Sequence, residues 1–115
     1  MKYSPVQNFI NGKFVDASTQ KSLEVISPLD GNLLSKVPMS SAKDLDDAVK
    51  AAKAAFPVWS KTPIKERVQV FFRYKTLLER DLKELASLCS EENGKTYGEA
   101  VAEVEKSIEL TEFAT

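Results

Sequence analysis

The sequence predicts an α/β fold in which β-hairpins come first and helices follow. Asn11-Gly12 separates two short segments rich in apolar residues, and Asn-Gly suits the positive φ values of a two-residue hairpin turn. Apolar residues recur at helical spacing from Leu45 onward, in stretches whose alanines favour helix. These observations place a boundary near residue 40. We expect hairpins over residues 1–39 and a helical segment over residues 40–115.

The N-terminal part is expected to contain two strand pairs. The first has its strands at residues 7–10 and 13–16. The second pairs residues 23–25 with residues 33–37 across the turn Pro28-Leu29-Asp30-Gly31. Pro28 and Pro38 are expected at strand ends or edges, because proline donates no ladder hydrogen bond.

Four helices are expected in the second part. The first begins at a capping box formed by Ser41 and Asp44, and its apolar pattern ends at Pro57. The second begins with Thr62 as N-cap and Pro63 at the first helical position.

The third and fourth helices are expected on either side of Asn93-Gly94. Asp81 and Glu84 have the spacing of another capping box, so the third helix starts there, and Asn93-Gly94 ends it. The fourth starts near Tyr97. Its inward-facing apolar residues are predicted to be Val101, Val104, Ile108 and Leu110.

Composition excludes several classes of partner. The chain has 115 residues and a net charge of −1 from 16 basic and 17 acidic residues, whereas a nucleic-acid partner requires a basic patch. No apolar run approaches the roughly 20 residues that span a bilayer, so no membrane partner is expected. The N-terminus lacks the apolar segment of a secretory signal. The single cysteine fits a reducing, cytoplasmic location, and the absence of histidine removes a common proton shuttle and metal ligand.

Two polar motifs are better explained by structure than by catalysis. Gly94-Lys95-Thr96 imitates the end of a phosphate-binding loop, but such a loop needs glycine where this chain has Cys89, so a helix stop is predicted. Asp44, Asp46 and Asp47 are too close together on one helix to converge on a metal ion. They are predicted to be first-turn acids favoured by the helix dipole.

Other polar and aromatic residues are also expected to be structural. Trp59 is predicted to anchor the end of the first helix on a neighbouring element. The last helix carries acids expected to face solvent or to pair with another element, namely Glu103, Glu105, Glu109 and Glu112.

Four short segments occur in one order along the chain. They are Phe9–Val15 (FINGKFV), Ile26–Gly31 (ISPLDG), Ala51–Trp59 (AAKAAFPVW) and Glu91–Thr96 (EENGKT). Each is a weak signal alone, but together they resemble the N-terminal part of the NAD(P)-dependent aldehyde dehydrogenase superfamily. Within it, the chain is most similar to the CoA-acylating methylmalonate-semialdehyde dehydrogenases. The resemblance covers residues 9–115.

The resemblance implies that residues 1–115 are the N-terminal part of a Rossmann-type cofactor-binding domain, which is incomplete in this chain. It implies a parent enzyme that oxidises a small aldehyde or semialdehyde with NAD(P) and that is a homo-oligomer, either a dimer or a tetramer. The acyl group would pass to water or to CoA. The rest of the dehydrogenase polypeptide is the expected partner, because the helices of this segment pack on a sheet whose main strands come later.

The family's catalytic cysteine and general-base glutamate lie in later motifs that this chain lacks, so no catalytic residue is assigned. Cys89 is predicted to be a buried core cysteine, because it stands at helical spacing from Leu82 and Leu85, and because Glu91 and Glu92 would raise its thiol pKa. With four glycines and no Gly-x-Gly-x-x-Gly motif, no cofactor contact is assigned either. The chain alone is expected to be inactive.

One family site is implied within the chain. Some aldehyde dehydrogenases hold a structural monovalent cation with backbone carbonyls, from the strand before the proline turn and from an acidic residue on the helix after Gly-Lys. The matching positions are Val25, Ile26 and Glu103. Glu103 lies one residue closer to the Gly-Lys pair than in the betaine-aldehyde type members.

Two other interpretations stay open. The chain could be a self-contained, non-catalytic helical module with an interaction or regulatory role, which predicts a complete fold and a defined partner surface. A standalone enzyme that uses Cys89 is the weakest hypothesis. The abrupt end at Phe113-Ala114-Thr115 favours a fragment whose apolar helix faces were shaped for missing partners. The isolated chain is therefore expected to be marginally stable or to self-associate.

Overall fold

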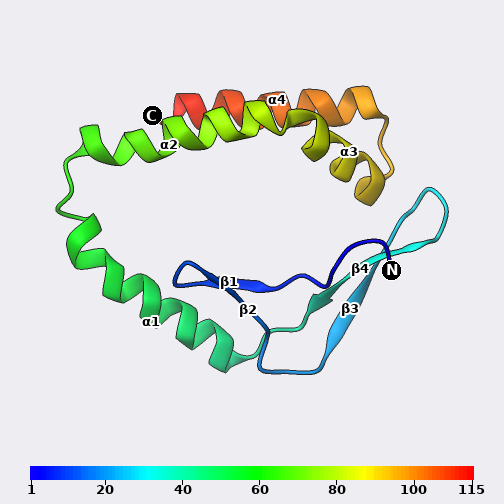
Figure 1. Cartoon of the computed structure of the whole chain (residues 1–115), viewed down its shortest axis with the longest axis horizontal. Helices are drawn as coiled ribbons and strands as arrows, with labels where there is room; N and C mark the ends of the chain where they lie inside the picture. Colours follow the sequence, from blue (N-terminus) through cyan, green and yellow to red (C-terminus); the bar gives the residue numbers. More distant parts are fainter. The chain divides into compact units, whose positions relative to one another are not determined.

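The computed structural model describes residues 1–115 and has four strands followed by four helices (Figure 1). The strands are β1 (Asn8–Ile10), β2 (Lys13–Val15), β3 (Ser22–Ile26) and β4 (Leu33–Pro38), and the helices are α1 (Ala42–Trp59), α2 (Ile64–Arg80), α3 (Leu82–Asn93) and α4 (Tyr97–Phe113). This order confirms the predicted hairpins and helices. Contacts group residues 1–26 and 31–61 in a first unit, and residues 27–30 and 62–115 in a second. By contact α1 belongs with the hairpins, whereas the boundary near residue 40 follows element type.

The first hairpin forms around the predicted turn. Asn11 and Gly12 have φ values of 52° and 75°, which confirms a turn with both central residues in the left-handed region. Phe9 lies opposite Phe14 with the ring centroids 5.0 Å apart, and both rings are exposed.

The second hairpin pairs β3 with β4 in antiparallel register, with an irregularity between Val25 and Ile26. Pro38 is the last residue of β4, which confirms its prediction as a strand-end proline. Pro28 lies in the turn between the strands, outside the ladder.

An N-terminal arm that the sequence did not predict runs along β4. Tyr3 N donates to the Leu34 carbonyl at 2.8 Å, and Val6 N donates to the Lys36 carbonyl at 2.9 Å. Leu34 is 5% exposed. Residues 2–6 therefore cover an edge of the sheet whose backbone groups would otherwise stay unpaired.

α1 begins at the predicted capping box. Ser41 Oγ accepts from Asp44 N at 3.3 Å, and Asp44 Oδ2 accepts from Ser41 N at 2.7 Å. The prediction that the helix ends at Pro57 was wrong by two residues, because α1 continues to Trp59. Proline removes one donor without denying helical dihedrals to the residues after it, and Ser60 N still donates back into the last turn.

α2 begins one residue later than predicted. Pro63 is the N-cap and not the first helical residue, because its ψ of 144° is extended. Its carbonyl accepts from Glu66 N and Arg67 N, so the helix proper starts at Ile64.

The predicted break at Asp81 is present, but the predicted capping box with Glu84 is wrong. Asp81 has φ −99° and ψ 10° and makes no side-chain cap. Its carboxylate instead accepts from Arg80 Nε at 2.8 Å and from Arg80 Nη2 at 2.7 Å. The N-cap geometry requires an extended backbone, which Asp81 does not have.

α4 begins at a capping box that was not predicted. Thr96 Oγ accepts from Glu99 N at 3.4 Å, and Glu99 Oε2 accepts from Thr96 N at 3.0 Å. The Thr-x-x-Glu spacing was the signal for it.

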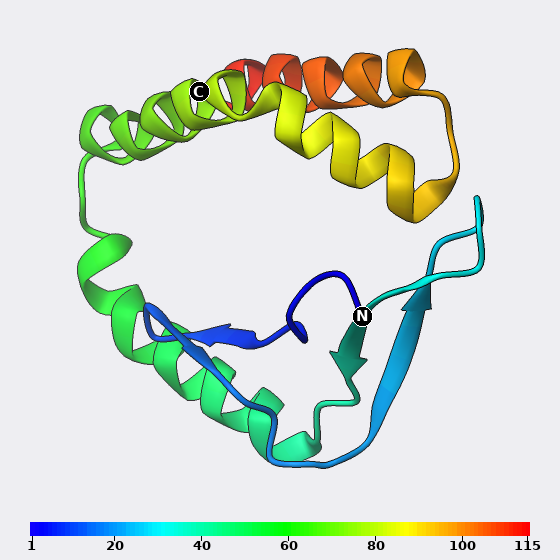
Figure 2. The same cartoon turned by 45° about the vertical axis from the view of Figure 1, so that its right-hand side comes forward.

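α4 runs back alongside α3 and α2 (Figure 2). Ala86 of α3 and Ala100 of α4 are both 0% exposed. Small side chains at these positions let the two helix backbones approach closely.

The inward face of α4 is largely as predicted. Val101, Val104 and Ile108 are half-buried. Leu110 was predicted to face inward, which is wrong, because its side chain is 56% exposed. Because an α-helix has 3.6 residues per turn, Thr111 and not Leu110 continues the inward face, and Thr111 is half-buried.

Few apolar side chains are buried in this chain. Leu34, Ala86 and Ala100 are the buried apolar residues, whereas Phe56 is 66% exposed and Phe113 is 90% exposed. The predicted surplus of uncovered apolar helix surface is therefore present. None of the four helices combines the length and apolar character that crossing a bilayer requires.

Replacing Gly94 with alanine should destabilise the second unit. Gly94 has φ 82°, and an added Cβ would lie 2.8 Å from Pro28 Cγ. The expected loss in free energy of unfolding is about 2 kcal/mol, because a left-handed residue with a side chain costs roughly 1–2 kcal/mol before the proline ring shifts. Urea unfolding followed by circular dichroism measures it.

Gly98→Ala is the matched control. A Cβ at Gly98 meets no atom within 4 Å, so the change in α4 should raise the free energy of unfolding by up to about 1 kcal/mol. Equal effects of the two substitutions would contradict the assigned role of Gly94.

Candidate functional site

The turn between α3 and α4 is a well-defined polar cluster of the second unit. Gly94 ends α3 in the left-handed region and Thr96 begins α4, which leaves Lys95 between the helices. Gly94 N donates to the Ser90 carbonyl at 2.8 Å, and Ser90 Oγ donates to the Lys95 carbonyl at 2.7 Å. The predicted helix stop is confirmed.

Lys95 and Glu103 form an ion pair that closes this turn. Lys95 Nζ donates to Glu103 Oε2, and Cys89 Sγ donates to the same oxygen at 3.6 Å. The hydrogen bond between Lys95 and Glu103 lowers the pKa of Glu103 and raises the pKa of Lys95. The side chains of Lys95 and Glu103 are 25% and 53% exposed, so solvent screens their attraction. The ion pair therefore helps to position α4 against the turn but adds little to the free energy of unfolding.

The Cys89 thiol is poorly suited to nucleophilic attack. Burial raises its pKa, and the negative charge of Glu103 raises it further. Glu91 and Glu92 were expected to raise this pKa, but the main negative charge comes from Glu103 on the next helix, and Glu92 contributes less. Cys89 is half-buried rather than part of a fully buried core.

Two further acids of α4 form ion pairs, and of these only Glu112 pairs with another element, as expected. Glu112 lies 3.1 Å from Lys75 Nζ on α2, and Glu109 lies 2.8 Å from Lys106 Nζ on α4 itself. The pKa of Lys75 is raised by its hydrogen bonds to Glu112 and Glu79.

The predicted cation ligands lie in different units. Val25 and Ile26 are consecutive residues at the end of β3, where the register with β4 is irregular. Glu103 lies on α4, and its carbonyl accepts from Ser107 Oγ at 3.1 Å. Val25 and Ile26 are neighbours in β3, whereas Glu103 belongs to the other unit. The cation site formed by all three residues stays a prediction. No group of three His, Cys, Asp or Glu side chains in the chain could hold a metal ion.

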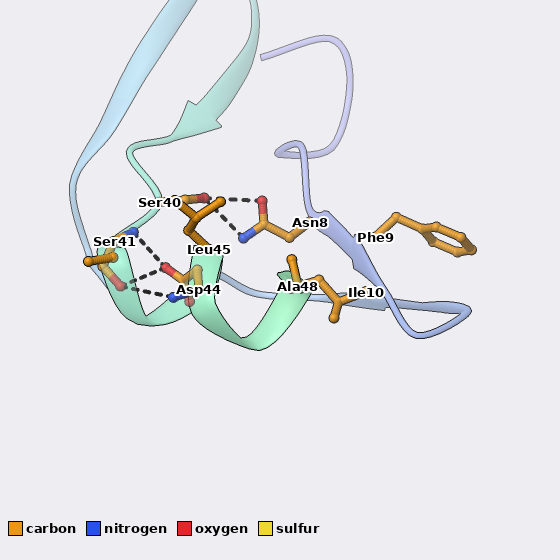
Figure 3. Close-up of a pocket in the computed structure, with 9 residues that line it drawn as sticks. Asn8, Phe9, Ile10, Ser40, Ser41, Asp44, Leu45 and Ala48 are labelled. Atoms are coloured by element: carbon orange, nitrogen blue, oxygen red, sulfur yellow. Dashed lines mark hydrogen bonds between the residues drawn. The ribbon is translucent and has the colours of Figure 1, made fainter. Parts of the chain in front are cut away.

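The first unit has an open hollow of ≈ 380 Å³ between β1 and the start of α1 (Figure 3). Its polar wall joins Asn8 to Ser40, because Asn8 Nδ2 donates to Ser40 Oγ at 3.0 Å and Ser40 Oγ lies 3.1 Å from Asn8 Oδ1. Its apolar wall contains Ile10, Leu45 and Ala48. These hydroxyl and amide groups bind one another. The carboxylate of Asp44 also lines the hollow, but its pKa of about 2 makes it a weak base.

Asp44 is the most strongly perturbed carboxylate of the first unit. Its side chain accepts four hydrogen bonds, from Ser41 N at 2.7 Å and from Ser41 Oγ, Ser18 N and Ser18 Oγ at 3.0 Å each. The backbone hydrogen bond from Ser41 is the main reason that the pKa falls to about 2. Asp44 therefore ties the segment after β2 to the start of α1.

The three neighbouring aspartates have separate partners. Asp46 lies 2.6 Å from Lys50 Nζ and Asp47 lies 2.5 Å from Lys43 Nζ, whereas Asp44 binds Ser18 and Ser41. Of the three, only Asp44 lies in the first turn of α1, so the prediction of first-turn acids was wrong for Asp46 and Asp47. The separate partners leave no shared ligand position. The capping role of Asp44 was visible in the sequence, but Ser18 lies 26 positions away and no local signal indicated its part.

Asp44→Asn should change how stability depends on pH. The folded state lowers the pKa of Asp44 from 3.8 to about 2. Its contribution is therefore complete above about pH 4 and is lost as the pH falls through about 2. Urea midpoints of the wild-type chain should fall over this window more steeply than those of Asp44→Asn, and the variant should be less stable at neutral pH.

Ser40→Ala is the control for this measurement. Its hydroxyl binds Asn8 and not Asp44, so the variant should keep the wild-type slope. An Asp44→Asn variant with an unchanged slope between pH 4 and pH 2 would refute the role given to Asp44.

Comparison with known proteins relates the chain to dehydrogenases. The model of the aldehyde dehydrogenase family matches residues 14–115. A malonate-semialdehyde dehydrogenase of Lacticaseibacillus casei is 48% identical over 109 residues, which cover 95% of this chain and 22% of that protein.

Solved structures with a similar fold are also dehydrogenases. A provisionally named methylmalonate-semialdehyde dehydrogenase from Sinorhizobium meliloti, complexed with NAD, has a TM-score of 0.91 at 34% identity, over 98% of this chain and 23% of that chain. An NADP-dependent glyceraldehyde-3-phosphate dehydrogenase from Bacillus halodurans, complexed with NADP, has a TM-score of 0.87 at 28% identity, over 91% of this chain and 22% of that chain. The chain thus spans less than a quarter of the length of these relatives. Because the family model matches most of its residues, the chain belongs to the aldehyde dehydrogenase family.

Proposed function

We propose that this chain is the N-terminal part of an NAD(P)-dependent aldehyde dehydrogenase that oxidises a small aldehyde or semialdehyde. The observation that carries the proposal is the match of 95% of the chain, at 48% identity, to 22% of a malonate-semialdehyde dehydrogenase. The names of such relatives favour a semialdehyde substrate. Transfer of the acyl group to CoA, as an alternative to water, belongs to the proposal only through the resemblance to CoA-acylating methylmalonate-semialdehyde dehydrogenases.

Residues 1–115 would act as scaffold of the cofactor-binding domain. NAD(P), when bound, supplies the hydride acceptor. The chain has no glycine-rich cradle for its pyrophosphate, and its most constrained glycine, Gly94, is packed against Pro28. The cofactor contacts are therefore proposed to come from other residues of a longer polypeptide. The raised pKa of Cys89 supports a separate catalytic cysteine as well.

The remainder of the dehydrogenase polypeptide is the proposed partner of the exposed apolar helix faces. Large side chains such as Phe72, 45% exposed, and Leu45, 67% exposed, fit positions that further chain would cover. A homo-oligomeric parent in the cytoplasm belongs to the same proposal. The alternative of a self-contained interaction module is disfavoured by the same exposure.

The activity can be tested with a family-length protein that contains residues 1–115. Malonate semialdehyde and NAD should yield NADH, and CoA should appear in the product as an acyl thioester if the enzyme is acylating. Cys89→Ser should keep the rate within about twofold, because a thiol with a raised pKa is not the nucleophile. The 115-residue chain alone should produce no NADH.

Two results would overturn the proposal. One is oxidation of aldehydes by the 115-residue chain alone. The other is loss of activity in Cys89→Ser with an unchanged circular dichroism spectrum.

The cation site is proposed at the carbonyls of Val25, Ile26 and Glu103. Crystals of the family-length protein grown in rubidium chloride should show an anomalous peak between these three oxygens. Glu103→Gln should keep the peak, because the backbone carbonyl and not the carboxylate is the ligand. Crystals without a peak near these carbonyls would refute the site.

A further inference from the structure

The chain contains two asparagine–glycine pairs, and the structure gives them opposite surroundings. Asn11-Gly12 is the turn between β1 and β2, whereas Asn93-Gly94 ends α3. An asparagine followed by glycine is prone to deamidation, because the nitrogen of the next residue must reach the side-chain carboxamide and glycine has no Cβ in the way. The sequence alone marks both pairs equally.

The backbone nitrogen of the glycine distinguishes the two pairs. Gly94 N donates to the Ser90 carbonyl at 2.8 Å, and a Cβ at Gly94 would meet the ring of Pro28. Gly12 N donates no hydrogen bond, and a Cβ at Gly12 would meet no atom within 4 Å. Both asparagine side chains are exposed, so the difference lies in the nitrogen that would attack and in the space around it.

The free energy needed to reach the reactive conformation also differs. Ring closure requires Asn11 to leave its left-handed conformation, so the hairpin must fray at its tip. β1 and β2 have three residues each and pair only with each other, and Phe9 and Phe14 are 64% and 71% exposed. A two-stranded hairpin of this kind is marginally stable. Freeing Gly94 N instead requires the end of α3 to unwind and the packing on Pro28 to open.

We propose that Asn11 is a site of spontaneous deamidation and that the fold protects Asn93. Hydroxide removes the proton of Gly12 N, and this nitrogen forms a bond to Asn11 Cγ. The Cγ–Nδ2 bond breaks, and Nδ2 takes a proton from water and leaves as ammonia. Water then opens the succinimide at either carbonyl, which gives aspartate or isoaspartate. Nothing is oxidised or reduced, and water is the only co-reactant.

The isoaspartate product changes the first hairpin. Its backbone runs through the former side chain, so the turn gains one methylene and one negative charge. A longer connection no longer fits a two-residue turn, and the register that places Phe9 opposite Phe14 is lost. Asn8 stays bound to Ser40, so the change is confined to the tip. The free carboxylate at the tip is a substrate for an enzyme that methylates isoaspartyl groups.

Ageing of the folded 115-residue chain at mildly alkaline pH tests the proposal. The tryptic peptides Tyr3–Lys13 and Glu84–Lys95 carry the two pairs separately, and mass spectrometry detects replacement of NH₂ by OH at each asparagine. Asn11 should deamidate at least about tenfold faster than Asn93, because this ratio needs only about 1.4 kcal/mol of additional opening free energy at Gly94. Isoaspartate methyltransferase with S-adenosylmethionine should label the Tyr3–Lys13 peptide.

The same measurement in urea is the control for local sequence effects. Unfolding releases Gly94 N, so the two asparagines should then deamidate at similar rates. Asn11→Gln should remove the acidic form from ion-exchange profiles of the aged folded chain, because the longer side chain cannot close the five-membered ring. Folded chains in which Asn93 reacts as fast as Asn11 would overturn the proposal. So would a rate difference that persists unchanged in urea, because it would come from neighbouring residues and not from the fold.

Discussion

The second unit depends on one backbone conformation, the left-handed turn at Gly94. The turn stops α3, and the ring of Pro28 closes the space in which a side chain would stand. Because the chain reverses there within three residues, α4 returns against α3, and Ala86 and Ala100 are both fully buried. The same reversal brings Lys95, Glu103 and Cys89 together. A polar cluster that resembles a reactive site is thus a consequence of helix packing, and the raised thiol pKa agrees with that origin.

The turns, helix caps and helix stops that depend on neighbouring residues were the features best predicted from the sequence. The Asn11-Gly12 turn, the Ser41–Asp44 capping box and the Gly94 stop each depend on a few neighbouring residues, and each is present. The errors at Pro57 and Pro63 are shifts of one or two residues, because proline restricts its neighbours unequally on its two sides. At Asp81 the spacing of a capping box was right but the backbone was not extended, so the side chain bound Arg80 instead.

Contacts between distant segments could not be predicted from the sequence. Ser18 binds Asp44, which lies 26 positions away in the sequence. The N-terminal arm pairs with β4 through backbone hydrogen bonds, which do not depend on the identity of the side chains. The candidate cation site has the same limitation, since carbonyl ligation at Val25, Ile26 and Glu103 does not depend on side-chain identity. Only the resemblance of short segments to a family indicated it.

The short segment at residues 27–30 belongs by contact to the second unit, although both of its neighbours along the chain belong to the first. The ribosome therefore releases Pro28 long before Gly94, the glycine against which it packs. During synthesis the first unit can form early, whereas residues 27–30 cannot pack until Gly94 has been synthesised. The second unit is then completed late. In a nascent chain arrested before α4, residues 27–30 would stay unpacked and accessible to chaperones.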